Sequence, residues 1–417
     1  MYHGSMESGG QGVYLANITR ELARRGHDVH VISAPPYPEL DPAVVHHRLR
    51  THSFQSMLLD RGAFFGGRPP LSHFHPLNFF EFASSRFTFS SLIAVFSLRA
   101  LQELKRIEAA DGPFDVIHDN QTLSYGVYLM KALVGRPVVA NVHHPLDVDL
   151  ANGLRHVAGT MRKAQRIAWY PWHMQHLVSR RLDALISGSR ASAELVSRLW
   201  NLRPGLMHTI YDGVDVDRFH PGAGGEVEPR SVLFVGNAED YNKGIVYLLR
   251  AMALLPARSR PRLYVVGGPQ GESLVVRGEV ERLGIGGSVE YVGRVPAKEL
   301  EAWYRRAQVL VSPSLYEGFG LPIVEAMASG MAVIATDGGA PPELVVQGET
   351  GLIVPAASPE ALAEAIASLV DSPERCRALG AAGRGRAVRE FTWERCALGT
   401  EALYTEVIAG RRARQSN

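Results

Sequence analysis

The sequence of 417 residues is poor in cysteine and nearly balanced in charge. Its two cysteines, Cys376 and Cys396, cannot form a disulfide framework or a cysteine-rich zinc site within the chain, which favours a reducing compartment. Lys and Arg number 44 against 42 Asp and Glu, a net charge of +2. This surplus is too small for sequence-independent binding to nucleic-acid phosphates, so we expect no nucleic-acid partner.

Long hydrophobic runs are also missing. Apolar stretches such as Ser91–Leu98 fall far short of the roughly 18 residues that a membrane-spanning helix needs. No basic start followed by an apolar stretch opens the chain, so a secretory signal is not indicated. Hydrophobic residues at 46% and charged residues at 21% are ordinary for a globular protein. We therefore expect a folded cytoplasmic protein.

Short runs rich in Val and Ile alternate with helical patterns, which predicts an α/β architecture with parallel sheets. In the first half, strands are expected at Val29–Ser33, Val116–His118, Val138–Val142 and Ala184–Ser187. The pattern then restarts, with strands expected at Val232–Val235, Leu263–Val266, Val289–Val292, Val309–Ser312 and Ala332–Ala335. The restart predicts two doubly wound Rossmann-like domains facing a central cleft.

At roughly 150 residues per domain, the length also favours two domains. We expect an N-terminal domain at 1–203, a linker rich in Gly, Pro and Asp at 204–229, and a C-terminal domain at 230–390. A doubly wound domain normally begins with a buried strand, but only eight mostly polar residues, Met1–Ser8, precede Gly9. The sequence therefore indicates either a degenerate first strand or a natural start upstream of Met1.

Two glycine clusters precede predicted helices, at Gly9–Gly12 and within Ser314–Met327. Glycines at a helix start expose backbone N–H groups, and the helix dipole favours an anion there, although tight turns use the same residues. The second cluster also contains Glu317 and Glu325. Either acid alone fits a surface or helix-capping role. The whole string instead indicates a ligand with hydroxyls next to phosphates, such as a nucleotide sugar.

The string Glu317–Glu325 resembles the E-x7-E signature of the family-4 retaining glycosyltransferases, in the E-G-F-G-L-P form. Further similarity to this family follows in family order at Tyr211–Asp215 with Phe219, Val235–Gly236 with Lys243–Gly244, Val265–Gly267, Tyr291–Gly293, Gly338–Gly339 with Pro342–Glu343, and Phe391–Trp393. The resemblance covers about Gly9 to Trp393. It implies the GT-B fold, with the final segment, 391–417, as a helix that crosses back to the N-terminal domain.

The resemblance also implies site residues. Glu317 would position the donor sugar, Lys243 would bind the diphosphate and Glu325 the ribose hydroxyls. His143 matches the family histidine near the reacting sugar carbon, so Glu317, His143 and Lys243 are the catalytic candidates. The other donor-binding candidates are Gly9, Gly10, Gly236, Asn237, Arg294, Val295, Gly318, Phe319, Gly320 and Leu321.

One position departs from the family pattern. The family usually has Arg after the Val-Gly strand end, and here that residue is Asn237. An amide cannot replace a bidentate guanidinium, so donor affinity is weaker or another basic residue substitutes. Lys243 then carries more of the diphosphate binding.

Several acidic and histidine pairs imitate metal sites. Asp147-Val148-Asp149 and Asp215-Val216-Asp217 have D-x-D spacing, but Asp215 belongs to a string that the family pattern already explains. His143 and His144 are adjacent at a strand end and would point to opposite sides. We therefore expect no metal and no cofactor, with a nucleotide-diphosphate sugar as the donor substrate.

These observations predict a metal-independent retaining glycosyltransferase that passes a sugar to an acceptor on the N-terminal domain. A nucleotide-sugar epimerase or phosphorylase on the same scaffold stays open, because fold does not determine function. A non-catalytic nucleotide-sugar binder, in which Asn237 marks a decayed site, also stays open.

The acceptor is the least determined part. Phenylalanines crowd into Phe74–Phe96, and Leu150–Leu182 contains no acid but several Arg, Lys and Trp residues. An apolar groove rimmed by positive charge favours a lipid-linked acceptor and peripheral contact with the inner face of the plasma membrane. The alternative is a phenylalanine-filled core with solvated arginines, and a soluble sugar acceptor.

Overall fold

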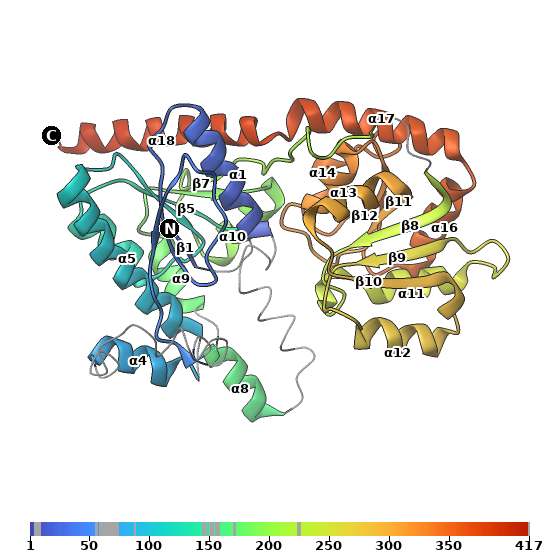
Figure 1. The fold of residues 1–417 in the computed structure, drawn as a ribbon, viewed down its shortest axis with the longest axis horizontal. Helices are drawn as coiled ribbons and strands as arrows, with labels where there is room; N and C mark the ends of the chain where they lie inside the picture. The colour runs from blue at the N-terminus through green and yellow to red at the C-terminus, as the bar shows by residue number, and fades with distance from the viewer. Residues whose placement is uncertain are drawn as a thin grey trace. The chain divides into compact units, whose positions relative to one another are not determined.

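The computed structural model describes residues 1–3, 10–54, 57, 75–86, 89–143, 147, 150, 154, 159–169, 172–222 and 227–415. Contacts divide the chain into two compact units, each with strands between helices (Figure 1). Unit 1 comprises Met1–Gly188, Ala193–Ile210 and Ala397–Asn417, and unit 2 comprises Ser189–Ser192 and Tyr211–Cys396. Within the described residues, no helix is long and apolar enough to cross a bilayer.

Unit 2 contains a six-stranded sheet whose neighbouring strands are all parallel. Its strands are β8 (Glu228–Val235), β9 (Arg262–Val266), β10 (Val289–Gly293), β11 (Ala307–Ser312), β12 (Ala332–Thr336) and β13 (Leu352–Val354). The order β10-β9-β8-β11-β12-β13 is the 3-2-1-4-5-6 order of a Rossmann sheet. The prediction of a doubly wound parallel sheet is confirmed for this unit, with β13 as an additional strand.

Helices cover both faces of this sheet, because its strands are apolar on both faces. Val232 and Phe234 pack on one side, and Leu233 between them packs on the other. The first face carries α11 (Ile245–Leu254), α12 (Leu274–Leu283) and α16 (Pro359–Val370), and the second carries α13 (Ala297–Arg306), α14 (Leu321–Ala328) and α15 (Pro341–Leu344). Figure 1 shows α11 and α12 on the opposite side of the strands from α13 and α14. A last helix, α17 (Pro373–Glu390), packs on α14.

Unit 1 is built on two parallel sheets, β1-β2-β3 and β4-β5-β6-β7. Their strands are β1 (Tyr2–His3), β2 (His30–Ala34), β3 (Val45–Arg48), β4 (Ile117–Asn120), β5 (Val138–Asn141), β6 (Ala184–Ser187) and β7 (Met207–Thr209). Met1 joins the sheets, because its ammonium donates to the His118 carbonyl at 2.6 Å and its own carbonyl accepts the Asn120 N–H at 2.9 Å. A first strand is therefore present, although its two residues were too few to predict from the sequence.

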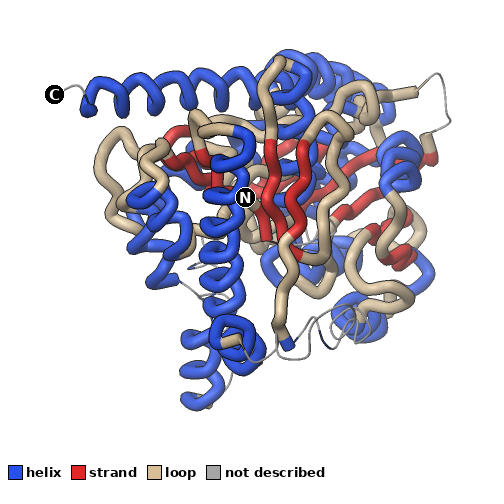
Figure 2. The backbone as a smooth tube through the Cα atoms, turned by 60° about the vertical axis from the view of Figure 1, so that its left-hand side comes forward, coloured by secondary structure: helices blue, strands red, loops and turns tan. Residues whose placement is uncertain are grey.

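The helices of unit 1 are α1 (Gly10–Arg24), α4 (Pro76–Ser84), α5 (Phe89–Asp111), α6 (Tyr125–Leu133), α8 (Thr160–Trp169), α9 (Trp172–Ser179), α10 (Arg190–Leu199) and the end of α18 (Trp393–Gln415). Helices of this unit lie beside its strands (Figure 2), whereas α4 and α8 lie farther from them (Figure 1). Residues of α5, α6, α9 and α10 share a core with Val138 and Ala140 of β5. From α18, Leu403 and Val407 pack against Val139 on the other face.

The structure also describes most of the predicted linker and both cysteines. Residues 204–229, predicted as a linker, include β7 and the first residues of β8, and Pro204 and Gly205 form a turn before β7. Cys376 and Cys396 are both free and buried, as expected of small apolar side chains.

Candidate active site

The predicted donor residues of unit 2 follow two adjacent strands. Gly236, Asn237 and Lys243 come after β8, and Glu317 comes after β11. In this strand order the chain continues from β8 toward β9 and from β11 toward β12, in opposite directions across the sheet. Open α/β sheets bind ligands at the carboxyl ends of such a strand pair. The fold therefore brings these candidates to the expected ligand position.

Lys243 and Glu317 form an ion pair at this position. The Lys243 ammonium lies 2.9 Å from Oε2 and 3.1 Å from Oε1 of Glu317, and the Ser314 hydroxyl donates to Oε2 at 3.0 Å. The side chains are 28% and 13% exposed, so water can reach the pair only in part. The site thus presents a cation suited to a diphosphate beside a carboxylate suited to sugar hydroxyls.

Glycines allow the loops of the site to pack closely. Gly244 has φ +68°, and a Cβ there would lie 1.9 Å from the Pro313 carbonyl oxygen. A Cβ on Gly338 would lie 2.3 Å from the Leu315 carbonyl oxygen. The loops are also joined by the Asn242 amide, which donates to the Tyr316 carbonyl at 2.6 Å. The glycines of the family pattern are needed here because no side chain fits between these backbones.

The helix α14 begins inside the glycine string. Gly320 adopts φ +110° at its N-cap, and Pro322 lies in its first turn. The Phe319 side chain is only 5% exposed and packs near Tyr211 and Phe391, so this residue can offer a ligand its backbone alone. The first N–H groups of α14 and its dipole favour an anion.

Glu325 is bonded to a residue that the sequence did not indicate. The Tyr304 hydroxyl of α13 donates to Glu325 Oε2 at 2.7 Å. Burial raises the pKa of Glu325, and burial together with the nearby carboxylate raises the pKa of Tyr304 well above its usual value. Tyr304 lies 21 positions before Glu325, and no local motif links two such residues.

The remaining candidates of unit 2 lie on the β8 and β10 loops. Gly236 N–H donates to the Val266 carbonyl at 3.0 Å. Asn237 is exposed, and its Oδ1 accepts the Glu239 N–H at 3.1 Å, which is a local turn contact. Arg294 is exposed and its carbonyl accepts from the Gln270 amide at 2.9 Å, while Val295 is half-buried.

In unit 1, His143 follows β5 and is held by two side chains. Its Nε2 lies 2.6 Å from Asn120 Oδ1, and its backbone N–H donates to Gln121 Oε1 at 2.6 Å. The Asn120 amide nitrogen donates to the Gln11 carbonyl at 3.1 Å, so Asn120 Oδ1 is an acceptor and His143 carries its proton on Nε2. Burial lowers the pKa of His143 to about 3, which keeps the ring neutral. Gly10 begins α1, and Gly9 lies outside the described residues.

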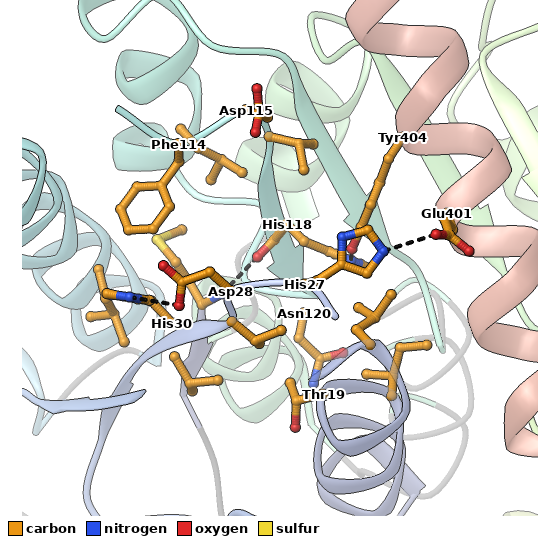
Figure 3. Close-up of a pocket in the computed structure, with 18 of the residues that line it drawn as sticks. Thr19, His27, Asp28, His30, Phe114, Asp115, His118, Asn120, Glu401 and Tyr404 are labelled. Atoms are coloured by element: carbon orange, nitrogen blue, oxygen red, sulfur yellow. Dashed lines mark hydrogen bonds and ion pairs between the residues drawn. The ribbon is translucent and has the colours of Figure 1, made fainter. Parts of the chain in front are cut away.

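A cavity of about 440 Å³ lies in unit 1 between β2, β4, α1 and α18 (Figure 3). His118 lies beside it, with Nδ1 2.5 Å from the Tyr404 hydroxyl and Nε2 2.5 Å from Asn141 Oδ1. Burial lowers the pKa of His118 to about 4. Among the described residues that line the cavity there is no predicted donor or catalytic residue.

The first aspartate of each D-x-D sequence, Asp147 and Asp215, is bonded to other residues of the protein. Asp147 accepts from Trp200 Nε1 at 2.7 Å and lies 3.0 Å from His176 Nε2. Asp215 accepts the Arg218 N–H at 3.1 Å within its own turn. Asp149 and His144 fall outside the described residues.

Each of the two α/β units is built on parallel strands. In unit 2, a lysine–carboxylate pair and the start of a helix lie where the chain changes its direction across the sheet. Together these features define a glycosyltransferase scaffold of the GT-B class. Comparisons with known proteins agree. The family described as Glycosyltransferase Family 4 matches residues 8–218, and the one described as Glycosyl transferases group 1 matches residues 216–386. The chain belongs to the family-4 glycosyltransferases.

Named relatives and solved structures span almost the whole chain. An MMP α-(1→4)-mannosyltransferase of Mycolicibacterium hassiacum is 36% identical, over 98% of this chain and 97% of the relative. D-inositol 3-phosphate glycosyltransferase 2 of Catenulispora acidiphila is 29% identical, over 98% and 93%. The structure of sucrose-phosphate synthase from Thermosynechococcus elongatus is similar with a TM-score of 0.73 and 25% identity, over 98% of both chains.

The predicted family, the GT-B fold and the enzyme class are thereby confirmed. The protein is a nucleotide-sugar-dependent glycosyltransferase of glycan synthesis. Transfer is favoured over the epimerase and binder alternatives, because the relatives named above are glycosyltransferases.

Proposed function

We propose that this enzyme transfers a hexosyl group from a nucleoside diphosphate to a hydroxyl acceptor, with retention of the anomeric configuration and without a metal ion. Mannose is the first candidate, because a relative 36% identical over nearly the full length is named a mannosyltransferase. Retention is proposed from the family resemblance of Glu317–Glu325. The observation that carries the proposal is the Lys243–Glu317 pair beside the start of α14.

The chemistry follows from charge. As the bond between the anomeric carbon and the diphosphate oxygen breaks, negative charge grows on the leaving phosphate. The Lys243 ammonium and the N–H groups at the start of α14 would stabilise that charge, which is the work a metal does elsewhere. The acceptor oxygen would attack the same face of the sugar, and its proton would pass to the departing phosphate. Glu317 would bind the sugar hydroxyls, and neutral His143 would lie near the reacting carbon.

The donor is tested by thermal unfolding in the presence of nucleotide sugars that vary in sugar and base. A ligand at 100 times its Kd stabilises by about 2.7 kcal/mol, so the correct donor raises Tm measurably. Nucleoside diphosphate release is then measured with mannose oligosaccharides, inositol phosphate and lipid-linked sugars. Acceptor-dependent release is expected. Conversion of the donor sugar without release would favour an epimerase, and binding without turnover would favour a binder.

We further propose peripheral contact with an anionic bilayer on the cytoplasmic side, and a lipid-linked acceptor as an alternative to a soluble one. On α4, Phe79 and Phe80 are 59% and 54% exposed. On α8, Met161 is 73% exposed and is followed by the exposed Arg162 and Lys163. Apolar side chains beside cations suit an anionic lipid surface. Both cysteines are free thiols, which supports a cytoplasmic location.

Other residues of the predicted membrane-binding surface are buried or form ion pairs within unit 1. Phe96 is buried in the core of unit 1, and Arg99 pairs with the buried Glu81 at 2.6 Å. Phe74 and Phe87 lie outside the described residues. The membrane proposal therefore depends on α4 and α8.

Liposome flotation tests this proposal. Binding is expected with acidic lipid in low salt, and the double variant Phe79→Ser/Phe80→Ser should weaken it. Leu254→Ser, at a 56% exposed position of unit 2, is the matched control and should bind like the wild type. Negligible flotation of the wild type with and without acidic lipid would refute the contact and leave a soluble acceptor.

A further inference from the structure

The first turn of α10 is capped by a side chain from a distant part of the sequence. Glu343 of α15 accepts the Arg190 N–H at 2.9 Å and the Ala191 N–H at 2.7 Å. The Ser192 N–H is accepted by Ser189 Oγ at 3.1 Å. The first N–H groups of a helix have no partner within the helix, so these contacts replace the missing ones. Glu343 and Ser189 together hold this turn, which belongs to unit 2.

The same turn binds the glycine string of the donor site. The hydroxyls of Ser189 and Ser192 both donate to the Gly318 carbonyl, at 2.6 Å and 3.0 Å. Because the Ser192 proton is used in this way, the Tyr316 hydroxyl must donate to Ser192 Oγ, at 2.8 Å. Ser189 and Ser192 are 0% and 1% exposed, so water does not compete for these bonds. The peptide between Gly318 and Phe319, one residue beyond Glu317, is thereby fixed.

The segment directly before α15 also holds Glu317 itself. Glu317 N–H donates to the Gly338 carbonyl at 2.8 Å, and the Glu317 carbonyl accepts the Ala340 N–H at 3.0 Å. The Glu343 side chain is 13% exposed, and the Tyr211 hydroxyl donates to its Oε2 at 3.0 Å. With three donors on one carboxylate, Glu343 has a defined orientation.

We propose that Glu343 is a positioning residue for sugar transfer, acting through Ser189 and Ser192 on the Gly318 carbonyl and hence on the Glu317 side chain. This inference rests on the proposed role of Glu317 in binding the donor sugar. Without the Glu343 carboxylate, two helix N–H groups lose their acceptor and the turn that holds Gly318 loosens. A displacement of about 1 Å at a reacting group costs on the order of 100-fold in rate.

The test is Glu343→Gln, which keeps the side-chain volume but loses the charge and one acceptor. Two affinities are measured, for the nucleotide sugar and for the nucleoside diphosphate alone, together with kcat. The preference is the ratio of the affinity for the nucleotide sugar to the affinity for the nucleoside diphosphate. We expect this ratio to fall about tenfold and kcat to fall about 10- to 100-fold. The affinity for the diphosphate should fall less than the affinity for the nucleotide sugar, because Lys243 and the later N–H groups of α14 are not altered. A loss of fold alone would weaken both ligands equally.

The matched control is Glu349→Gln, an exposed acid a few residues further along the chain, which should behave like the wild type. Ser192→Ala should shift kcat and the preference in the same direction as Glu343→Gln, and it replaces that variant if Glu343→Gln does not fold. In the double variant Glu343→Gln/Ser192→Ala, the fold reduction in kcat should be smaller than the product of the two single reductions, because both side chains act through Gly318.

Wild-type kcat and preference in stable Glu343→Gln and Ser192→Ala proteins would overturn the inference. Glu317→Gln separates this outcome from failure of the proposed function. If Glu317→Gln transfers sugar normally, the proposed role of Glu317 is wrong. If Glu317→Gln is inactive while Glu343→Gln is normal, only the positioning role is wrong.

Discussion

Replacing Glu317 by Gln separates the catalytic contribution of this carboxylate from its contribution to stability. The side chain contacts the Lys243 ammonium at 2.9 Å and 3.1 Å and the Ser314 hydroxyl at 3.0 Å. Gln keeps the volume and one acceptor oxygen, so the Ser314 bond can persist while the charge beside Lys243 is lost. Exposed ion pairs contribute about 0–1 kcal/mol, whereas breaking a fully buried pair costs about 3–5 kcal/mol.

The exposed fractions of 13% and 28% place this pair between those limits. We therefore expect the free energy of unfolding to fall by about 1–2 kcal/mol, which lowers Tm by a few degrees. The effect on transfer should be larger. Losing one interaction that stabilises charge or orientation in the transition state costs about 100- to 1000-fold in kcat.

The assay is the initial rate of nucleoside diphosphate release at saturating donor and acceptor, with Tm measured on the same preparation. Glu349→Gln, which removes an exposed acid, provides the comparison for charge loss alone. A rate within threefold of the wild type would refute the reasoning. A Tm drop of more than about 10 °C would show instead that Glu317 is mainly structural, because it exceeds what a partly exposed pair can contribute.

Three further outcomes are expected. Burial raises the pKa of Asp212 to about 7, so stability to urea should decline between about pH 4 and pH 7, where the unfolded chain ionises but the folded protein does not; Asp212→Asn should flatten that decline. Gly244→Ala should lower the free energy of unfolding by more than about 1 kcal/mol, because φ is +68° and Cβ would meet the Pro313 carbonyl; an unchanged Tm would contradict this. Activity should survive exhaustive chelation, and a loss restored by magnesium or manganese would refute metal independence.

Much of the fold could be predicted because its signals are local. The strands β8, β9, β11 and β12 are apolar runs between turn residues, and hydrophobic runs of this kind can be recognised without knowing their neighbours. The glycines of Ser314–Met327 were equally visible, and at Gly320 the φ of +110° favours glycine. The resemblance to the family rests on motifs built from such residues, and the comparisons confirm it.

The short strands could not be predicted in this way. β1, β7 and β13 contain two or three residues each, too few for an alternating pattern to appear. They are strands only because a neighbouring strand supplies hydrogen-bond partners, as β2 does for Tyr2 and His3. The partner is specified by sheet order, which is a property of the folded chain.

The supporting contacts of the site also depend on tertiary structure. Glu343 binds Arg190 and Ala191, which lie about 150 positions earlier, and Asn120 determines the protonated nitrogen of His143 across adjacent strands. From the sequence alone Glu343 was one residue of a family pattern, and Ser189 and Ser192 had no assigned role. A sequence motif reports which backbone conformations and charges are locally available. For Asn120 and His143 the partner is decided when β4 and β5 pair, because parallel pairing brings the carboxyl ends of distant segments to the same edge of a sheet.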